Sequence, residues 1–184
     1  MRASDPPPGE RIPARNLLLV GFMGAGKTTV GRVLASSIGW RFIDIDEEIV
    51  RRAGMSIADL FRTSGETAFR AMESELTAGL SSVDRTVISP GGGWIAAPEN
   101  IERLPPMTCT VWLRVPVEEA VRRVRAAGIR RPLLSGPGDP VVAARKLLDR
   151  REPLYGQADL VVDTAHRTPE EIAREIRSRI RLEG

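Results

Sequence analysis

Residues Gly21-Phe22-Met23-Gly24-Ala25-Gly26-Lys27-Thr28 match the G-x-x-x-x-G-K-[ST] pattern of a phosphate-binding loop. Its glycines let backbone N–H groups close around phosphate oxygens. Its lysine reaches the outer phosphates, and its threonine hydroxyl can ligate Mg²⁺. An apolar run of strand length, Asn16–Val20, precedes the loop, and apolar residues recur at helical spacing from Thr28 to Ile38. This order of strand, loop and helix places a helix N-terminus at the phosphates, so the sequence predicts a protein that binds a nucleoside triphosphate.

The size and composition of the chain favour one globular domain. Its 184 residues are 42% hydrophobic and 28% charged, which is ordinary for a soluble protein with a full core. The single cysteine, Cys109, lies in an apolar run, so we expect a buried thiol and no disulfide. No stretch reaches the length of a membrane span, and no signal peptide is recognisable before the first strand. We therefore expect a cytoplasmic protein that does not bind a membrane.

Strand-like and helical segments alternate along the chain, which predicts an α/β fold with a parallel sheet covered on both faces. The expected strands are 16–20, 41–45, 86–89, 108–115 and 159–162. The expected helices are 28–38, 46–52, 57–80 with a break near Ser64-Gly65, 99–104, 117–127, 140–151 and 169–182.

Two segments lack this alternation. Residues 1–13 are rich in proline and are interpreted as a disordered leader, which leaves 14–184 as the single domain. Residues 128–139 hold glycines and prolines without a regular pattern, and a loop of this length in a compact domain is typical of a mobile lid or of a disordered insert.

Two carboxylates lie close to the end of the second expected strand. Asp44-Ile45-Asp46 closes this strand, and residues two apart in a strand face the same side, so we expect both carboxylates to point into the crevice where open α/β sheets bind ligands. One could organise Mg²⁺ and the other could meet an acceptor hydroxyl. The alternative for Asp46 is an ordinary helix N-cap, which leaves Asp44 unexplained.

Glycines and arginines supply the remaining candidates. Pro90-Gly91-Gly92-Gly93 follows the third strand, where glycines permit close approach to a ligand, although a plain loop remains an alternative. Arg70 could pair with a carboxylate or phosphate, or be a surface arginine. Arg131 lies in the expected lid, where arginine can close over a transferring phosphate. Arg151 ends a helix and could merely complement its dipole.

Taken together, these motifs resemble those of the shikimate kinase family. The matching pieces are Gly21–Thr29, Asp44-x-Asp46, Gly65-Glu66-x-x-Phe69-Arg70, Gly91-Gly92-Gly93, Arg131-Pro132-Leu133-Leu134 and Arg151-x-Pro153-Leu154-Tyr155. They occur in the family's order over about residues 16–180, and the set is far more specific than the phosphate loop alone. The resemblance implies a P-loop kinase fold of the nucleoside-monophosphate-kinase type, with strand order 2-3-1-4-5 and a mobile lid. It implies transfer of the ATP γ-phosphate to the 3-hydroxyl of shikimate, in the biosynthesis of chorismate and the aromatic amino acids.

The resemblance also implies roles for individual residues. Lys27, Asp46 and Arg131 would be catalytic, and Thr28 and Asp44 would hold Mg²⁺. Asp46 would contact the reacting hydroxyl, and Arg70 and Arg151 would grip the shikimate carboxylate. The expected ATP-binding residues are Gly24, Ala25, Gly26, Lys27, Thr28, Thr29, Arg123 and Arg131. The expected substrate-binding residues are Asp46, Arg70, Gly91, Gly92, Gly93 and Arg151.

Trp94 departs from the family pattern, which usually has a small residue after the triple glycine. We expect it to pack beneath the substrate region or to alter its shape.

Three other functions stay open at this point. A kinase for another carboxylated polyol, such as gluconate, would also use arginines. A sensor that binds nucleotide or shikimate without turnover would not need the complete set Lys27, Thr28, Asp44, Asp46 and Arg131. A nucleic-acid binder is suggested by the clustered arginines, yet the net charge is only +3, so we expect no nucleic-acid partner. A monomer is expected.

Overall fold

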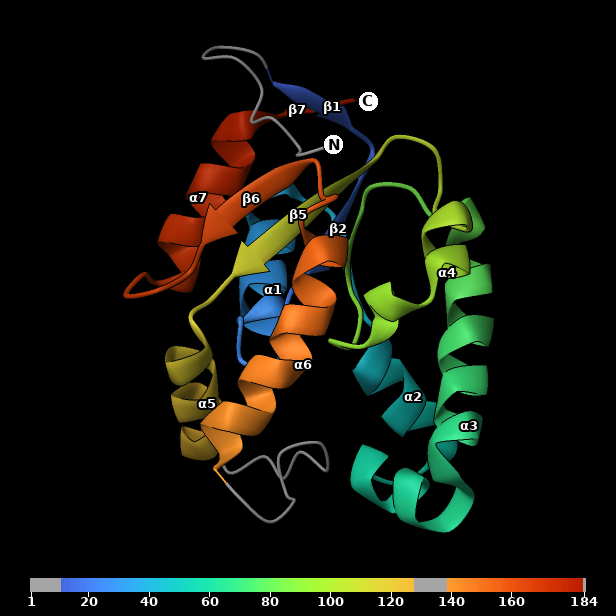
Figure 1. Cartoon of the computed structure of the whole chain (residues 1–184). Helices are drawn as coiled ribbons and strands as arrows, with labels where there is room; N and C mark the ends of the chain where they lie inside the picture. The colour runs from blue at the N-terminus through green and yellow to red at the C-terminus, as the bar shows by residue number, and fades with distance from the viewer. Residues whose placement is uncertain (1–10, 128–138, 184) are drawn as a thin grey trace.

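The computed structural model describes residues 11–127 and 139–183. At its centre is a five-stranded sheet in the order β3-β4-β2-β5-β6, and every pair in it is parallel (Figure 1). Numbered along the chain, these strands have the order 2-3-1-4-5, as expected. Their bounds are β2 (Asn16–Val20), β3 (Arg41–Asp44), β4 (Thr86–Ser89), β5 (Thr108–Arg114) and β6 (Leu160–Asp163). The central strands β2 and β4 are buried along their whole length, which explains their nearly continuous apolar sequence.

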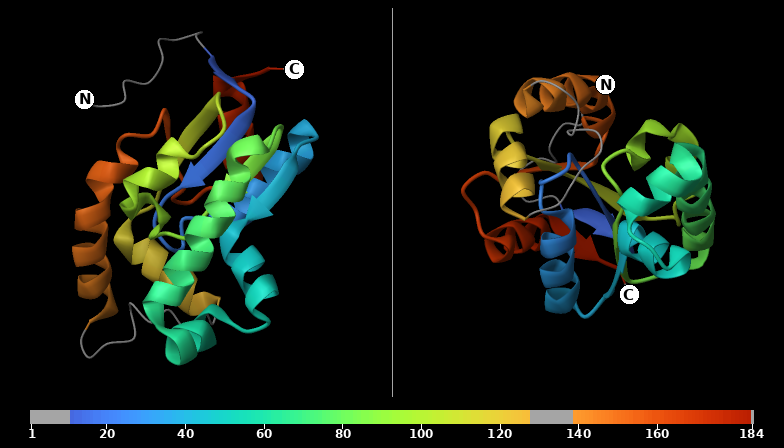
Figure 2. Two further views of the ribbon diagram at one scale, coloured as in Figure 1. Left: turned by 90° about the vertical axis from the view of Figure 1, so that its right-hand side faces the viewer. Right: turned by 90° about the horizontal axis from the view of Figure 1, so that it is seen from below.

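Helices connect and cover these strands. Their bounds are α1 (Lys27–Ile38), α2 (Ile45–Ala53), α3 (Ile57–Ala78), α4 (Pro98–Glu102), α5 (Val117–Ala126), α6 (Pro140–Tyr155) and α7 (Pro169–Arg179), with 3-10 turns η1 (Gly79–Ser82) and η2 (Trp94–Ala96). The expected break in α3 is confirmed at Gly65, where φ is 78°. Viewed from below, the α2–α3 pair and the α5–α6 pair lie on opposite sides of the strand ends (Figure 2).

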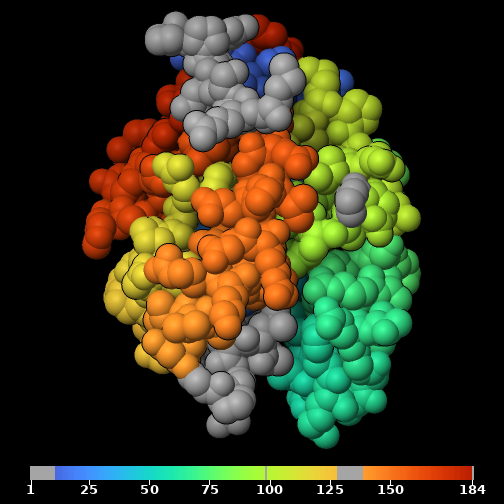
Figure 3. All heavy atoms as spheres, in the orientation of Figure 1, coloured from blue at the N-terminus to red at the C-terminus, as the bar shows by residue number. Residues whose placement is uncertain are grey.

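Successive side chains of β2 point to opposite faces of the sheet, and the hydrophobic core is accordingly divided into two clusters. Leu17 and Leu19 belong to the cluster that packs α1, α5 and α7, whereas Leu18 and Val20 belong to the one that packs α2, α3 and η2. The end of α6 joins the second cluster through Tyr155, and the surface of α6 lies beside that of η2 and α4 (Figure 3). Cys109 is buried, as predicted, and burial raises its pKa to about 12.

A second, two-stranded sheet was not predicted. β1 (Ile12–Ala14) pairs in parallel with β7 (Ile180–Leu182). The expected leader boundary at residue 13 is therefore wrong, because Ile12 and Pro13 already belong to β1. The expected helix 169–182 is also too long, since α7 ends at Arg179 and the chain continues as β7. Apolar spacing alone does not separate the last turn of a helix from a short strand.

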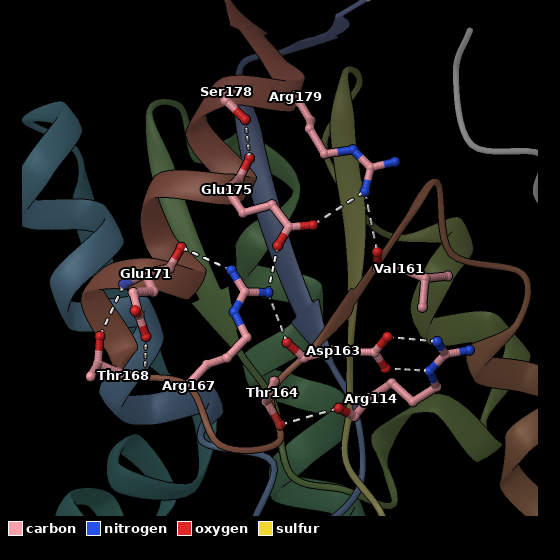
Figure 4. A network of polar contacts seen from close by, with 10 residues as sticks. All are labelled: Arg114, Val161, Asp163, Thr164, Arg167, Thr168, Glu171, Glu175, Ser178 and Arg179. Carbon is pink, nitrogen blue, oxygen red and sulfur yellow. Dashed lines mark hydrogen bonds and ion pairs between the residues drawn. The ribbon is translucent and has the colours of Figure 1, made fainter. Parts of the chain in front are cut away.

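An arginine network fixes α7 against the sheet (Figure 4). Arg167 donates to the carbonyls of Asp163 and Glu171, and also pairs with Glu175. Arg114 forms a two-point pair with the Asp163 carboxylate. The helix begins with the predicted capping box between Thr168 and Glu171.

The expected lid falls almost wholly on residues 128–138, which lie outside the described residues. Asp139, its last residue, caps α6 by accepting a hydrogen bond from the Val141 amide. None of the helices in the described ranges is long and apolar enough to span a membrane.

Candidate active site

The phosphate loop joins β2 to α1, as the motif predicts. Gly24 has φ 75°, and a Cβ there would lie 2.6 Å from the Ala120 carbonyl oxygen, so only glycine fits without strain. Gly26 has φ 90° and occupies the N-cap position of α1. The first amides of α1 therefore face the loop, where the helix dipole favours an anion.

Lys27 lies over this loop. Its ammonium group donates to the Gly21 carbonyl at 2.9 Å and to the Phe22 carbonyl at 3.3 Å. These two carbonyls thus hold the positive charge of Lys27 beside the loop. Phosphate oxygens can replace the carbonyls as its hydrogen-bond acceptors.

Thr28 and Asp44 meet beside the loop. The Thr28 hydroxyl donates to the Asp44 carboxylate at 2.6 Å, and Asp44 is only 8% exposed. The other Asp44 oxygen accepts from the Glu47 amide and caps α2. The expected cap was Asp46, so that alternative is wrong: β3 ends at Asp44, and Asp46 lies in the first turn of α2. The argument that both carboxylates share a strand face fails for the same reason.

The donor set beside the loop fits Mg²⁺. A hydroxyl and a carboxylate oxygen in contact supply hard oxygen ligands, which this cation prefers. Across the described ranges no three His, Cys, Asp or Glu side chains gather as a metal centre.

The glycine turn after β4 is the point where the other candidates meet. A Cβ on Gly91 would lie 2.7 Å from an Asp46 carboxylate oxygen and 3.3 Å from one of Glu73. A Cβ on Gly93 would lie 2.8 Å from an Arg70 nitrogen and 3.2 Å from one of Arg151. The glycines are thus explained by close approach to charged side chains.

Gly92 connects this turn to the phosphate loop. A Cβ on it would lie 3.4 Å from the Met23 amide nitrogen and 3.6 Å from the Gly21 carbonyl oxygen. The carboxylate of Asp46, the arginine pair and the phosphate loop therefore border one another around this turn.

Arg70 projects from α3 and is held by two carboxylates. It donates to Glu73 at 2.6 Å and to Glu66 at 3.1 Å. Its side chain is 36% exposed, so one side of the guanidinium remains open toward solvent. The sequence analysis missed Glu73; its spacing of three residues from Arg70 on a helix is the signal that could have found it.

Glu73 is the most deeply buried charge of this group. It is 2% exposed, and one of its carboxylate oxygens has no hydrogen-bond partner among the residues that the structure describes. Burial raises the pKa of Glu73, and the pairing with Arg70 opposes that rise only in part.

Arg151 and Tyr155 hold the glycine turn from the other side. Both donate to the Gly92 carbonyl, at 3.0 Å and 2.7 Å respectively. Arg151 is 9% exposed, so it does more than complement the end of α6. Burial raises the pKa of Tyr155 to about 12, so its hydroxyl remains a donor at neutral pH.

Arg123 reaches the loop from α5. It donates to the Gly24 carbonyl at 3.3 Å and to the Thr164 carbonyl at 2.8 Å, and it pairs with Glu119. This places Arg123 beside the phosphate loop, whereas its expected role in binding ATP stays a prediction. Arg131 lies outside the described residues, so its role also stays a prediction.

Comparison with known proteins identifies the family. The family model described as shikimate kinase matches residues 23–181. A shikimate kinase of Synechococcus sp. (strain RCC307) is 42% identical over 96% of this chain and 90% of its own length. One from Moorella thermoacetica is 40% identical over 90% of this chain and 94% of its own.

Solved structures agree with this result. Shikimate kinase from Acinetobacter baumannii, solved in complex with shikimate, superposes with a TM-score of 0.83 and is 38% identical over 90% of this chain and 92% of that one. A gluconokinase from Sinorhizobium meliloti has a TM-score of 0.57 at 21% identity over 91% of each chain, a similarity of fold alone. The chain belongs to the shikimate kinase family.

Proposed function

We propose that this protein is an ATP-dependent kinase that phosphorylates the 3-hydroxyl of shikimate, giving shikimate 3-phosphate and ADP. The observation that carries the proposal is the convergence of Asp46, Arg70 and Arg151 on the Gly91–Gly93 turn, directly beside the phosphate loop. A carboxylated polyol bound there would place a hydroxyl near Asp46 and its carboxylate near the two arginines.

The reaction asks for positioning and charge neutralisation rather than covalent chemistry by the protein. The hydroxyl oxygen attacks the γ-phosphorus, the bond to the β,γ-bridging oxygen breaks, and ADP departs with that electron pair. Asp46 accepts a hydrogen bond from the attacking hydroxyl, orients it, and takes its proton late in the transfer. Lys27 and the α1 N-terminus offset charge on the outer phosphates.

Thr28 and Asp44 would hold Mg²⁺, which when bound neutralises phosphate charge. Arg131 would contact the transferring phosphate, Arg123 the nucleotide, and Gly92 the substrate ring. These roles are implied by the resemblance of the sequence to the shikimate kinase family. A monomeric, cytoplasmic enzyme that uses no nucleic-acid partner belongs to the same proposal.

The decisive experiment measures ADP release with ATP and Mg²⁺ on shikimate, quinate and gluconate in parallel. We expect turnover on shikimate to exceed that on the other two acceptors by at least tenfold. A preference for gluconate would reassign the substrate, and binding of shikimate without ADP release would identify a sensor.

Lys27→Ala should abolish nearly all turnover while leaving thermal unfolding unchanged, because it removes the charge that meets the transferring group.

A further inference from the structure

Trp94 connects the glycine turn to the helix that carries Arg70 and Glu73. It follows Gly93 directly, its side chain is fully buried, and its amide donates to the Gly91 carbonyl at 3.1 Å. Its indole N–H donates to the Thr77 hydroxyl at 2.8 Å. That hydroxyl in turn donates to the Glu73 carbonyl at 2.7 Å.

This chain of hydrogen bonds ends at the helix face that the site uses. Arg70, Glu73 and Thr77 are spaced by three and four residues and therefore share one face of α3. The hydrogen bond between Trp94 and Thr77 thus fixes the Gly91–Gly93 segment relative to two side chains on α3. Glu73 lies one helical turn from Thr77, and Arg70 lies two helical turns from it. Asn100 secures the other side of Trp94 by donating to its carbonyl at 3.0 Å.

The distance between the Gly91–Gly93 turn and α3 can change little without disturbing Arg70. A Cβ on Gly93 would lie 2.8 Å and 3.1 Å from the two terminal nitrogens of Arg70, so the turn backbone already borders that guanidinium. A shift of a few tenths of an ångström in the turn would move Arg70 or open a gap beside it. An apolar side chain could fill the same volume, but it could not hold Thr77.

We propose that Trp94 is a positioning residue for acceptor binding, which sets the distance between the Gly91–Gly93 turn and the Arg70–Glu73 pair. The inference rests on the proposed function for its kinetic test, because the acceptor there is shikimate. Trp94 acts through Arg70 and the turn and does not itself contact the reacting atoms.

The kinetic test uses Trp94→Phe, which keeps most of the volume and removes the donor. We expect the KM for shikimate to rise about fivefold, the size of one neutral hydrogen bond, while kcat and the KM for ATP stay within about twofold. Trp40→Phe is the matched control, because Trp40 packs against the core cluster on the opposite face of the sheet. An unchanged KM for shikimate in Trp94→Phe, or an equal rise for ATP, would overturn the proposal.

Thr77 provides a second pair of variants. Thr77→Val keeps the shape and removes the hydroxyl, so we expect it to raise the KM for shikimate as Trp94→Phe does. Thr77→Ser keeps the hydroxyl and should remain within about twofold of the wild type. The double variant Trp94→Phe/Thr77→Val should show less than the product of the single effects, since each single variant already removes the shared bond between the indole and the Thr77 hydroxyl. Multiplicative effects would refute the connection.

Hydrogen exchange of the ligand-free protein tests the connection without any substrate. Amides of residues 91–97 should exchange faster in Trp94→Phe than in the wild type or in Trp40→Phe. Equal exchange in all three would overturn the positioning role. If the wild type failed to phosphorylate shikimate, the proposed function would fall, but this measurement would still decide whether Trp94 fixes the turn.

Discussion

Glu73 shows how a single residue couples charge, burial and binding. Its carboxylate holds Arg70 in place, yet it lies within the same small volume as Asp46 and raises the local negative charge. A buried carboxylate is costly, and a cation beside it offsets the cost only where the geometry is close. In the proposed function, the pair would keep the guanidinium of Arg70 oriented before a substrate carboxylate arrives.

The raised pKa of Glu73 makes its contribution to stability depend on pH. The unfolded chain releases this proton at the usual glutamate pKa, whereas the folded protein retains it to higher pH. Wild-type stability conferred by this group is therefore full below the unfolded pKa and is lost as pH rises through the folded pKa. Glu73→Gln cannot titrate, so its melting temperature relative to the wild type should increase from pH 4 to pH 7. A difference that does not change over that range would contradict the assigned pKa direction.

A change at Arg151 tests the proposed contact with the shikimate carboxylate more directly than a change at Arg70. When Arg151 is removed, Tyr155 still donates a hydrogen bond to the Gly92 carbonyl and holds the turn. Arg151→Ala should weaken shikimate binding about ten- to a hundredfold, the loss of a charge-assisted hydrogen bond, with little change for ATP. Arg151→Lys should recover only part, because the planar fork is lost. Arg150→Ala is the control, as Arg150 is exposed on the same helix. Calorimetric titration with each ligand measures both constants, and an equal loss for both would argue against a carboxylate role.

At the scale of elements, the prediction from sequence succeeded where a motif constrains the backbone. The phosphate loop and the five strands follow from glycine spacing and from apolar runs separated by helical patterns, whereas the order of the strands was implied by the resemblance to the shikimate kinase family. The sequence did not show that Asp44 rather than Asp46 caps α2, because the boundary between β3 and α2 depends on a capping hydrogen bond. The contacts of Thr77 and Tyr155 with the glycine turn region were not predicted, because only tertiary packing brings these residues there.

The glycine turn makes an element-scale prediction. Gly93 has φ −94°, so alanine fits its backbone, but the added Cβ would displace the ends of Arg70 and Arg151. Gly93→Ala should therefore raise the KM for shikimate about tenfold or more, by loss of a charge-assisted contact, without lowering the melting temperature appreciably. Gly79→Ala is the matched control, because Gly79 also has a right-handed conformation and its Cβ would meet nothing within 4 Å. Similar kinetics for both variants would show that the turn tolerates a side chain.

At the scale of the whole molecule, the β1–β7 pair and the candidate active site lie at opposite ends of the central strands. The β1–β7 pair lies at the end where the central strands begin, whereas the phosphate loop and the glycine turn follow the ends of β2 and β4 (Figure 1). Parallel α/β sheets place ligands at the carboxyl ends of their strands, so the opposite end is available for closing the fold. The sequence could not predict this pair, because two three-residue strands so far apart in the chain leave no periodic signal.

This separation predicts that the β1–β7 end can be weakened without affecting the chemistry. Ile180 is 2% exposed in the core cluster and pairs with Ile12. Truncating it to alanine removes a buried aliphatic side chain at a cost of about 2–5 kcal/mol, which corresponds to a melting temperature lower by about 5–15 °C. Arg181→Ala on the same strand is the control, since its pair with Glu183 is exposed and contributes little. Both variants, assayed well below their melting temperatures, should keep the wild-type KM values for shikimate and ATP. A raised KM for shikimate in Ile180→Ala would show that the two ends of the sheet are coupled, because the loss of packing would then have reached the glycine turn.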